Sequence, residues 1–288
     1  MLPEKITIIE VGPRDGFQFE KKIVPTSLKI KIISDLINSG LKCIQVTSFV
    51  NPKIIPQLSD AEEIIKAFSN VNDVYISALT LNKKGVLRAI DAGLKNVDIS
   101  ISASNTHSVK NTGMNLVKAR KELIEMICHA KQNNMTISVL IQCSFGCFFE
   151  GNIKINNIID ILNDISNYQV NMFTLCDTTG MANPLQIKQT IKTIKEVSKA
   201  IPIGLHLHDT YGIGLANVFA ALEMDIRNFD TSFGSIGGCP FIPNAPGNIS
   251  TENTVYMLES MGIKTGVDIK KVTNCSNQMK KFFNKNRL

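Results

Sequence analysis

The stretch Ile6-Thr7-Ile8-Ile9-Glu10-Val11-Gly12-Pro13-Arg14-Asp15-Gly16 sets the pattern that the rest of the chain repeats. Its first six residues are rich in β-branched side chains, which is typical of a buried strand. The Gly/Pro turn that follows lacks the G-x-G-x-x-G spacing with which a dinucleotide-binding sheet enters its first helix. The end of this strand therefore favours a closed barrel over an open, doubly wound sheet.

The alternation of a short β-branched run with a longer segment of helical periodicity recurs eight times along the chain. The expected strands are 6–11, 43–48, 74–79, 97–102, 136–142, 170–176, 202–207 and 228–233. The expected helices are 26–39, 59–69, 83–92, 114–133, 155–167, 184–199, 213–224 and 251–262, with a further helix near 268–284. This pattern predicts an α/β chain folded as a (β/α)8 TIM barrel with an additional C-terminal helix. The length of 288 residues suits a single catalytic domain over 1–288.

The composition argues against two classes of partner. Hydrophobic residues make up 44% of the chain, but no apolar run approaches the roughly 18 residues that a membrane span needs. The formal net charge is +6, yet the lysines are spread along the chain and no basic cluster is interleaved with aromatic residues. An anionic small molecule is therefore favoured over a membrane or a nucleic acid.

The cysteines and the start of the chain predict a cytoplasmic protein. The seven cysteines are odd in number and scattered over expected strands and helices, which suits a reducing compartment better than a disulfide framework. Strand one begins almost at Met1, so we expect no leader peptide. Most of the thiols are expected to be small, buried hydrophobic groups.

Polar side chains gather where the expected strands end, and barrels of this kind carry their active sites at the carboxyl ends of the strands. These positions are Arg14 and Asp15 after strand one, Thr47 and Ser48 in strand two, 102–111 with His107 after strand four, 143–151 after strand five, Asp177 after strand six, His206 and His208 at strand seven, and 234–248 after strand eight. We therefore expect these groups to meet at one mouth of the barrel.

His206 and His208 are two residues apart on a strand and so face the same side. Together with Asp15 and Asn248 they offer two nitrogens and two oxygens, a set that suits a divalent cation. Mg²⁺ or Mn²⁺ fits this set, and Zn²⁺ is compatible with it. The alternative is that the two histidines only line a polar barrel mouth.

Arg14 and Cys239 are the other candidates for chemistry. Arg14 presents a fork suited to a carboxylate or an enolate oxygen; the alternative makes it a structural partner of Glu10 or Asp177. Cys239 lies in the glycine-rich loop 234–240, where a thiol can donate or accept a proton. The glycines also predict a movable lid that excludes water.

Several longer motifs stand in order along the chain. They are Val11-Gly12-Pro13-Arg14-Asp15-Gly16-Phe17-Gln18, Thr47-Ser48-Phe49-Val50, Gly146-Cys147-Phe148-Phe149-Glu150-Gly151, His206-Leu207-His208-Asp209-Thr210-Tyr211-Gly212, Gly237-Gly238-Cys239-Pro240-Phe241, Gly247-Asn248 with Thr251-Glu252, and Val255-Tyr256-Met257-Leu258-Glu259. In this order and at these separations, they resemble the hydroxymethylglutaryl-CoA lyase family. The resemblance covers nearly the whole chain.

The resemblance implies a metal-dependent TIM-barrel lyase that cleaves 3-hydroxy-3-methylglutaryl-CoA, a CoA thioester, to acetyl-CoA and acetoacetate. It also implies a homodimer and a place in leucine catabolism and ketone-body formation. The implied metal ligands are Asp15, His206, His208 and Asn248; the implied catalytic residues are Arg14 beside the substrate carbonyl, Cys239 as proton donor, and His206 or Asp15 as base. Further candidates for substrate binding, beside Arg14, are Gln45, Ser48, His107, Asp177 and Glu252.

Two departures from the family pattern bear on the substrate. Family members usually carry Glu where this chain has Gln45, and an aromatic residue near the position of Leu140. We expect the first to weaken the orientation of Arg14 or the metal shell, and the second to reshape the acyl pocket. The stretch from Ser104 to Asn111 is more similar to related barrels that form carbon-carbon bonds.

Two alternative functions follow from these departures. A related aldolase or condensing transferase, acting on another 3-hydroxyacyl or keto-acid substrate, would usually carry a further C-terminal region. A non-catalytic barrel that binds CoA thioesters would be expected to have lost one of the candidate catalytic residues, and this chain keeps them all.

Overall fold

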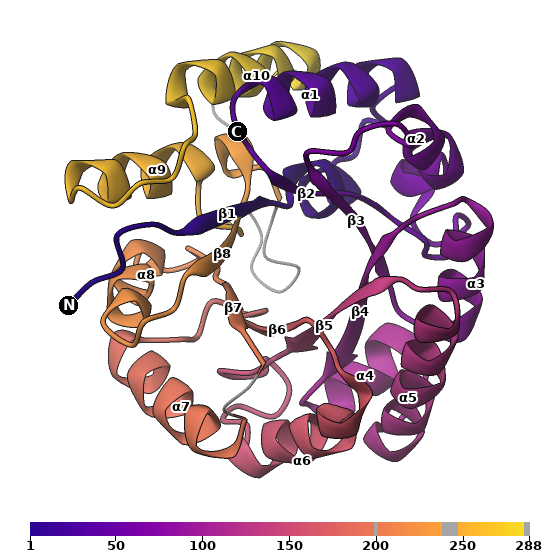
Figure 1. Ribbon diagram of the computed structural model, residues 1–288, viewed down its shortest axis with the longest axis vertical. Coiled ribbons are helices and arrows are strands. Elements are labelled where there is room, and N and C mark those ends of the chain that lie inside the picture. The colour runs from indigo at the N-terminus through magenta and orange to yellow at the C-terminus, as the bar shows by residue number, and fades with distance from the viewer. Residues whose placement is uncertain (199–200, 238–246, 285–288) are drawn as a thin grey trace.

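The computed structural model describes residues 1–198, 201–237 and 247–284, and its centre is a closed barrel of eight parallel strands (Figure 1). The strands are β1 (Thr7–Glu10), β2 (Cys43–Ser48), β3 (Tyr75–Thr80), β4 (Asn96–Ser102), β5 (Thr136–Gln142), β6 (Met172–Cys176), β7 (Ile203–His206) and β8 (Asn228–Thr231). They follow one another around the barrel in chain order, and β8 pairs with β1 to close it. The predicted (β/α)8 architecture is confirmed.

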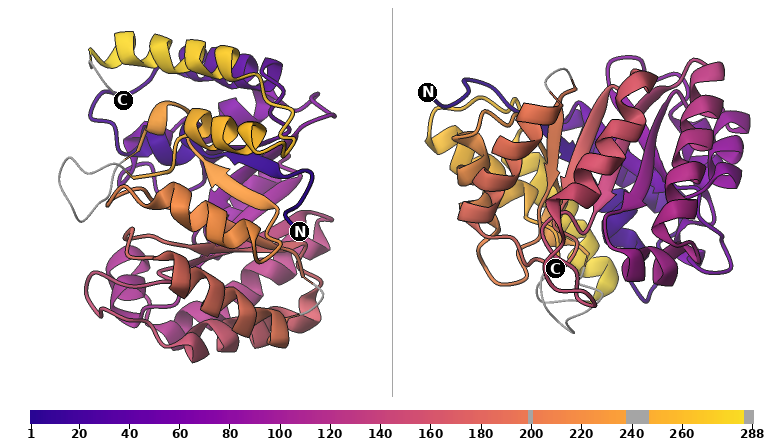
Figure 2. Two further views of the ribbon diagram at one scale, coloured as in Figure 1. Left: turned by 90° about the vertical axis from the view of Figure 1, so that its left-hand side faces the viewer. Right: turned by 90° about the horizontal axis from the view of Figure 1, so that it is seen from below.

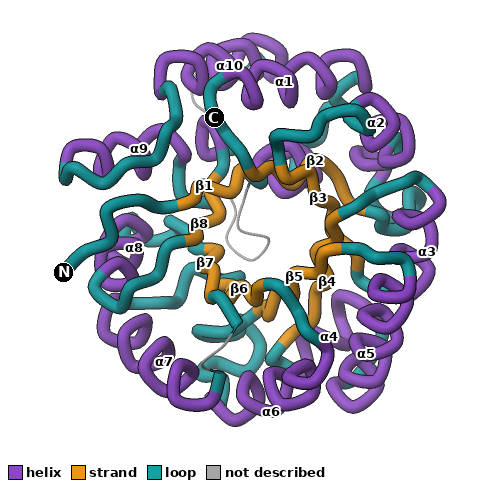
Figure 3. The backbone as a smooth tube through the Cα atoms, in the orientation of Figure 1, coloured by secondary structure: helices purple, strands orange, loops and turns teal. Residues whose placement is uncertain are grey.

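Helices form an outer ring around the strands (Figure 3). They are α1 (Thr26–Asn38), α2 (Ala61–Ala67), α3 (Lys83–Asp91), α4 (Asn105–Thr112), α5 (Leu116–Gln132), α6 (Ile155–Ile165), α7 (Pro184–Val197), α8 (Gly214–Leu222), α9 (Thr251–Ser260) and α10 (Ile269–Phe283). The additional C-terminal helix, α10, lies beside α1 (Figure 2). Within the described part of the chain, no helix has both the length and the apolar character that crossing a membrane requires.

The main hydrophobic core lies between this ring and the outer faces of the strands. Helix α6 shows how the sequence builds it, because Ile158, Ile161, Leu162 and Ile165 are buried at helical spacing. Burying a side chain of this size contributes roughly 1.5–3 kcal/mol. The apolar periodicity that predicted the helices is therefore the stripe that attaches them to the barrel.

One helix was not expected from the sequence. The segment after β4 was predicted as a loop followed by one helix over 114–133, but the structure has α4 and α5, separated by Gly113 in the left-handed conformation at φ 71°. Helix α4 carries little apolar periodicity. It begins where the Ser104 hydroxyl accepts the backbone N–H of His107 at 3.1 Å, and this cap stabilises the helix start.

The turn after β1 places two of the candidate residues at the mouth of the barrel. Residues Gly12–Gly16 form one turn of π-helix, in which the Val11 carbonyl accepts the N–H groups of Arg14 and Asp15 at 3.0 and 2.7 Å. Such turns are often found at functional sites. A Cβ on Gly12 would lie 2.6 Å from the Phe233 ring, so this turn needs glycine for close packing.

The inside of the barrel is unusually polar. A cavity of about 160 Å³ inside it is lined by side chains that include Gln45, Ser77, Asp98 and Asp230. Barrels of this fold usually fill the interior with branched apolar side chains. Here a small apolar cluster of Leu79, Leu140 and Cys176 is separate from the main core. Ionisable groups thus occupy interior positions that more often serve packing alone.

Candidate active site

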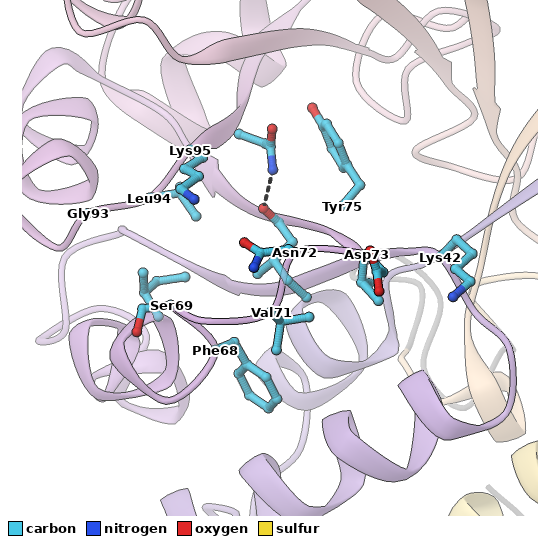
Figure 4. A pocket seen from close by; sticks show the side chains of 14 residues that line it. Lys42, Phe68, Ser69, Val71, Asn72, Asp73, Tyr75, Gly93, Leu94 and Lys95 are labelled. Atoms are coloured by element: carbon cyan, nitrogen blue, oxygen red, sulfur yellow. Dashed lines mark hydrogen bonds between the residues drawn. The ribbon is translucent and has the colours of Figure 1, made fainter.

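Arg14 and the candidate metal ligands lie at the carboxyl ends of the strands, whereas Gln45 lies within β2, His107 on α4 and Glu252 on α9. Arg14 and Asp15 follow β1, His206 is the last residue of β7, and His208 forms an antiparallel bridge with Asn248. A cavity of about 490 Å³ lies at the opposite end of the barrel, where the strands begin (Figure 4). None of the described candidate residues lines that cavity, so the chemistry of the side chains identifies the site better than cavity size does.

Asp15, His206 and His208 form a buried cluster whose ligand atoms all lie within 4.8 Å of one another. The two Nε2 atoms are 3.3 Å apart, and His206 Nε2 is 3.8 Å from Asp15 Oδ2. Each of the three residues is at most 6% exposed. Two imidazoles and a carboxylate at this spacing could hold one metal ion.

Asp230 orients the first of these histidines. Its Oδ2 lies 3.1 Å from His206 Nδ1, and a carboxylate can only accept a hydrogen bond, so the proton of the neutral ring belongs on Nδ1. The lone pair of Nε2 then faces His208 and Asp15. A carboxylate behind a histidine is the usual support for a metal-binding imidazole.

The hydrogen bonds of Asn248 indicate that a cation would fit this site. Its Nδ2 donates to Asp15 Oδ2 at 2.8 Å, while its Oδ1 is buried and has no hydrogen-bond partner among the described residues. His208 Nδ1 is also buried and has no partner in the part of the chain that the structure describes. A buried amide oxygen without a donor is costly, and oxygen is a ligand that divalent cations accept. The amide of Asn248 thus fits as a fourth ligand.

The charges in the cluster favour metal-binding protonation states. Burial alone would raise the pKa of Asp15, but the positive charge of Arg14 and interactions with both histidines lower it overall. Burial and the neighbouring His206 lower the pKa of His208 to about 3. At neutral pH, Asp15 is therefore ionised and His208 is neutral, as metal ligation requires.

The Arg14 guanidinium is held on two sides. Its Nη1 donates to Asp15 Oδ1 and its Nε donates to Gln45 Oε1. Arg14 does not bond Glu10 or Asp177, the structural partners considered from the sequence; among the described residues its partners are Asp15 and Gln45. This arrangement leaves Nη2 without a hydrogen bond to a described residue.

Glu10, which the sequence indicated only as a partner for Arg14, instead holds two segments of the barrel mouth together. It is fully buried, and its carboxyl accepts the N–H groups of Gly12 and Phe233 at 2.8 and 3.0 Å and the Thr251 hydroxyl at 2.6 Å. Burial raises its pKa to about 8. Glu10 thus links the turn that carries Arg14 to the segment after β8.

The remaining substrate candidates separate into two groups. Ser48 Oγ and Asp177 Oδ2 are buried and have no hydrogen-bond partner within residues 1–198, 201–237 and 247–284. Burial raises the pKa of Asp177 to about 7. His107 lies on α4, with Nδ1 3.1 Å from Ser102 Oγ. Glu252 instead accepts from the backbone of Gly234 and from two serine hydroxyls. Its carboxylate is thus already bound to the protein.

The comparison with known proteins decides the family. The HMGL-like family model matches residues 5–279. The chain belongs to the HMGL-like family. Within it, the chain is 38% identical over 274 residues to the hydroxymethylglutaryl-CoA lyase YngG of Bacillus subtilis, covering 95% of this chain and 92% of that protein. The curated relatives differ in length, and the chain spans from 58% to 92% of them.

Solved structures of family members have the same fold. The HMG-CoA lyase of Bacillus subtilis superposes with a TM-score of 0.96 at 37% identity, over 99% of this chain and 96% of that one. The HMG-CoA lyase of Acinetobacter baumannii, solved with coenzyme A and 3-methylmalate, superposes with a TM-score of 0.92 at 36% identity, over 99% and 93%. Cys239, predicted to be catalytic, lies outside the described residues of this HMGL-like protein.

Proposed function

We propose that this HMGL-like protein is a carbon-carbon lyase that cleaves 3-hydroxy-3-methylglutaryl-CoA to acetyl-CoA and acetoacetate with a divalent cation. The observation that carries the proposal is the buried cluster of Asp15, His206 and His208 at the barrel mouth, in a chain of this family. The similarity to lyases of known structure supports the substrate, because the Acinetobacter relative binds coenzyme A.

Asp15, His206, His208 and Asn248 would hold the cation. When bound there, a divalent ion supplies positive charge that acidifies the tertiary hydroxyl of the substrate and polarises its carbonyl oxygens. Of the ions considered, Mg²⁺ and Mn²⁺ suit the two oxygen donors best. Asp230 keeps the Nδ1 proton of His206 in place, so Nε2 keeps its lone pair in the site.

The reaction requires one proton to leave an oxygen and one to reach a carbon. A base removes the proton of the tertiary hydroxyl, and His206 and Asp15 are the candidates. The new C=O bond forms as the C–C bond breaks, which releases acetoacetate. The electron pair passes into the thioester enolate of the acetyl-CoA fragment. Cys239 then protonates the enolate carbon.

Arg14 is placed to stabilise the enolate. Asp15 and Gln45 fix the plane of its guanidinium, and Nη2 remains available to donate to the thioester oxygen. A donor held in advance, where negative charge develops, stabilises the transition state more than the ground state. We further propose that Ser48, His107 and Asp177 contact the substrate, and that Gln45, whose amide is bound to Arg14 and Asp98, acts on the substrate through Arg14.

For Glu252 we propose a different role from the one expected. Its Oε2 accepts the Gly234 N–H at 2.9 Å and the Ser250 hydroxyl at 2.9 Å, and its Oε1 accepts the Ser276 hydroxyl. Because these bonds occupy both of its oxygens, Glu252 fixes the turn before Gly237 rather than the substrate. A homodimer, a cytoplasmic location and a part in leucine catabolism and ketone-body formation stay predictions.

The test is acetoacetate release from hydroxymethylglutaryl-CoA by the purified protein with Mg²⁺ or Mn²⁺, beside an EDTA-treated sample. Cys239→Ala should keep metal binding and lose turnover by orders of magnitude. Cys128→Ala, on α5 and away from the barrel mouth, is the matched control and should keep full activity. Release that resists EDTA, or an active Cys239→Ala protein, would contradict the mechanism.

A protein that binds the metal but releases no acetoacetate would contradict the substrate assignment. The same preparation would then be supplied with acetyl-CoA and keto acids, and free CoA would be measured. Condensation in this assay would identify the related transferase activity in place of the lyase.

A further inference from the structure

Gln45 stands between Arg14 and a carboxylate that lies two strands further around the barrel. It is 2% exposed and lies on β2, where its Oε1 accepts from Arg14 Nε. Its Nε2 donates to Asp98 Oδ2, on β4, at 2.5 Å. Three buried side chains, 31 and 53 residues apart in sequence, thus form one line of hydrogen bonds from the turn after β1 to β4.

The two ends of this line determine which way the Gln45 amide points. Arg14 can only donate, so it requires the amide oxygen on its side. An ionised Asp98 can only accept, so it requires the amide nitrogen. A flipped amide would bring N–H groups against the guanidinium and an oxygen against the carboxylate. Without Arg14 or without the Asp98 carboxylate, only one hydrogen bond would still favour this orientation of the Gln45 amide over the flipped one.

Asp98 is itself held in place. The Ser77 hydroxyl donates to the same Oδ2 at 2.6 Å, and the β2–β3 register pairs Gln45 with Ser77. Burial raises the pKa of Asp98 to about 6, against the lowering effect of these two hydrogen bonds. The carboxyl is thus mostly ionised at neutral pH. The cavity of about 160 Å³ next to it means that side-chain packing does little to fix Gln45.

We propose that Asp98 is a positioning residue for Arg14 and acts through Gln45. The inference rests on the proposed function, in which Arg14 binds the thioester oxygen. The arrangement also affects the charge that Arg14 can offer to the substrate. Arg14 Nε contacts a neutral carbonyl, and the negative charge lies beyond the amide. The guanidinium is therefore aligned with less neutralisation than a carboxylate on Nε would cause, and keeps more charge for the enolate.

The first test is Asp98→Asn in the metal-loaded protein. The introduced asparagine has one acceptor oxygen for two donors, and its own amide can flip, so Gln45 loses its fixed orientation. We expect kcat to fall about 10- to 100-fold, as is typical when a residue that orients a metal ligand by a hydrogen bond is replaced. KM and Mn²⁺ affinity should stay within about threefold, because Asp98 contacts neither cation ligands nor the mouth. Ser138→Ala, in the same cavity, is the control.

A second substitution distinguishes positioning from a structural role. Gln45→Glu alone brings a second carboxylate to within hydrogen-bond distance of Asp98, where like charges repel, and should lower kcat. In the double variant Gln45→Glu with Asp98→Asn, the amide of the introduced asparagine donates to a carboxylate that contacts Arg14 directly. The double variant should therefore be more active than either single variant. A purely structural role for Asp98 predicts that the two losses multiply.

A third readout does not depend on turnover. The chain has five arginines, so ¹⁵N-arginine labelling gives few Nε–H signals, and Arg14→Lys assigns the one of interest. Asp98→Asn should shift this signal and speed its exchange with water, whereas Ser138→Ala should not. If the wild type releases no acetoacetate, the lyase proposal fails, and the Arg14 Nε–H signal alone then tests whether Asp98 positions Arg14. An unchanged Arg14 signal, or wild-type kcat in Asp98→Asn, would overturn the inference.

Discussion

Replacing Glu10 by glutamine should make the protein more stable at alkaline pH. The folded-state pKa of Glu10 is raised to about 8 from an ordinary value of 4.5, chiefly by burial. The folded protein therefore binds a proton that the unfolded chain releases near pH 4.5. The contribution of such a group to the free energy of unfolding is largest below its pKa in the unfolded chain. It is lost as the pH rises through the pKa of the group in the folded protein.

The size of the effect follows from these two values. Between about pH 6 and about pH 8.5, the linkage relation gives a loss of about 2–3 kcal/mol in the free energy of unfolding from Glu10 alone. Other carboxyls with a raised pKa, such as Asp98 and Asp177, change stability equally in both proteins. The difference between wild type and Glu10→Gln therefore isolates Glu10.

Glutamine fits the same contacts without a charge. Its oxygen can accept the Gly12 and Phe233 N–H groups, as Glu10 Oε1 does. Its amide can donate to the Thr251 hydroxyl, which lies 2.7 Å from the hydroxyl of Thr231 and can donate onward. The turn that carries Arg14 should thus keep its shape.

The assay is urea unfolding of both proteins at about pH 6, 7 and 8.5, with EDTA present throughout so that metal binding does not vary. The stability of the variant should exceed that of the wild type by a margin that grows with pH. Glu10→Ala, which leaves buried donors without an acceptor, should be less stable than the wild type near pH 6 by at least about 1–3 kcal/mol. If wild type and Glu10→Gln change in parallel with pH, Glu10 is not protonated in the folded protein and the reasoning is wrong.

Two further substitutions test the support of the site. Asp230→Ala should lower Mn²⁺ affinity about 10- to 100-fold, because His206 loses the carboxylate that orients it. Calorimetry would measure the affinity, with the exposed Asp225→Ala as control, and equal affinities of the two variants would contradict the prediction. Gly12→Ala should reduce the free energy of unfolding by about 1–3 kcal/mol, because the new Cβ would lie 2.6 Å from the Phe233 ring. Urea unfolding would measure this change, and an unchanged free energy would show that the turn can shift without loss of stability.

Periodicity was enough to predict the barrel, since each strand and each main helix buries an apolar face that the sequence displays. Helix α4 was missed for the same reason. Its eight residues, Asn105–Thr112, carry mostly polar side chains, and what stabilises it is a cap at Ser104. A cap of this kind also begins many turns, so it does not predict a helix by itself.

The candidate site was predictable only where residues stand at strand ends. Arg14, Asp15 and His206 could be placed together because parallel strands bring their carboxyl ends to one mouth. Asp98 and Asp230 could not, because they lie within strands, and only the closed register shows that they face inward and which partners they meet. A buried aspartate inside a β-branched run was the available signal, and its meaning depended on contacts between strands distant in sequence.

The bridge between His208 and Asn248 couples the proposed metal ligands to the described flanks of segment 238–246. The Asp209 N–H donates to the Gly247 carbonyl at 2.7 Å, and the Asn248 amide donates to the Ile236 carbonyl at 3.4 Å. The described flanks of segment 238–246 are thus attached at Asn248, a proposed metal ligand, and at Asp209, the neighbour of another, His208. A substitution that breaks either hydrogen bond should therefore disturb the proposed metal site together with the anchoring of the segment that carries Cys239.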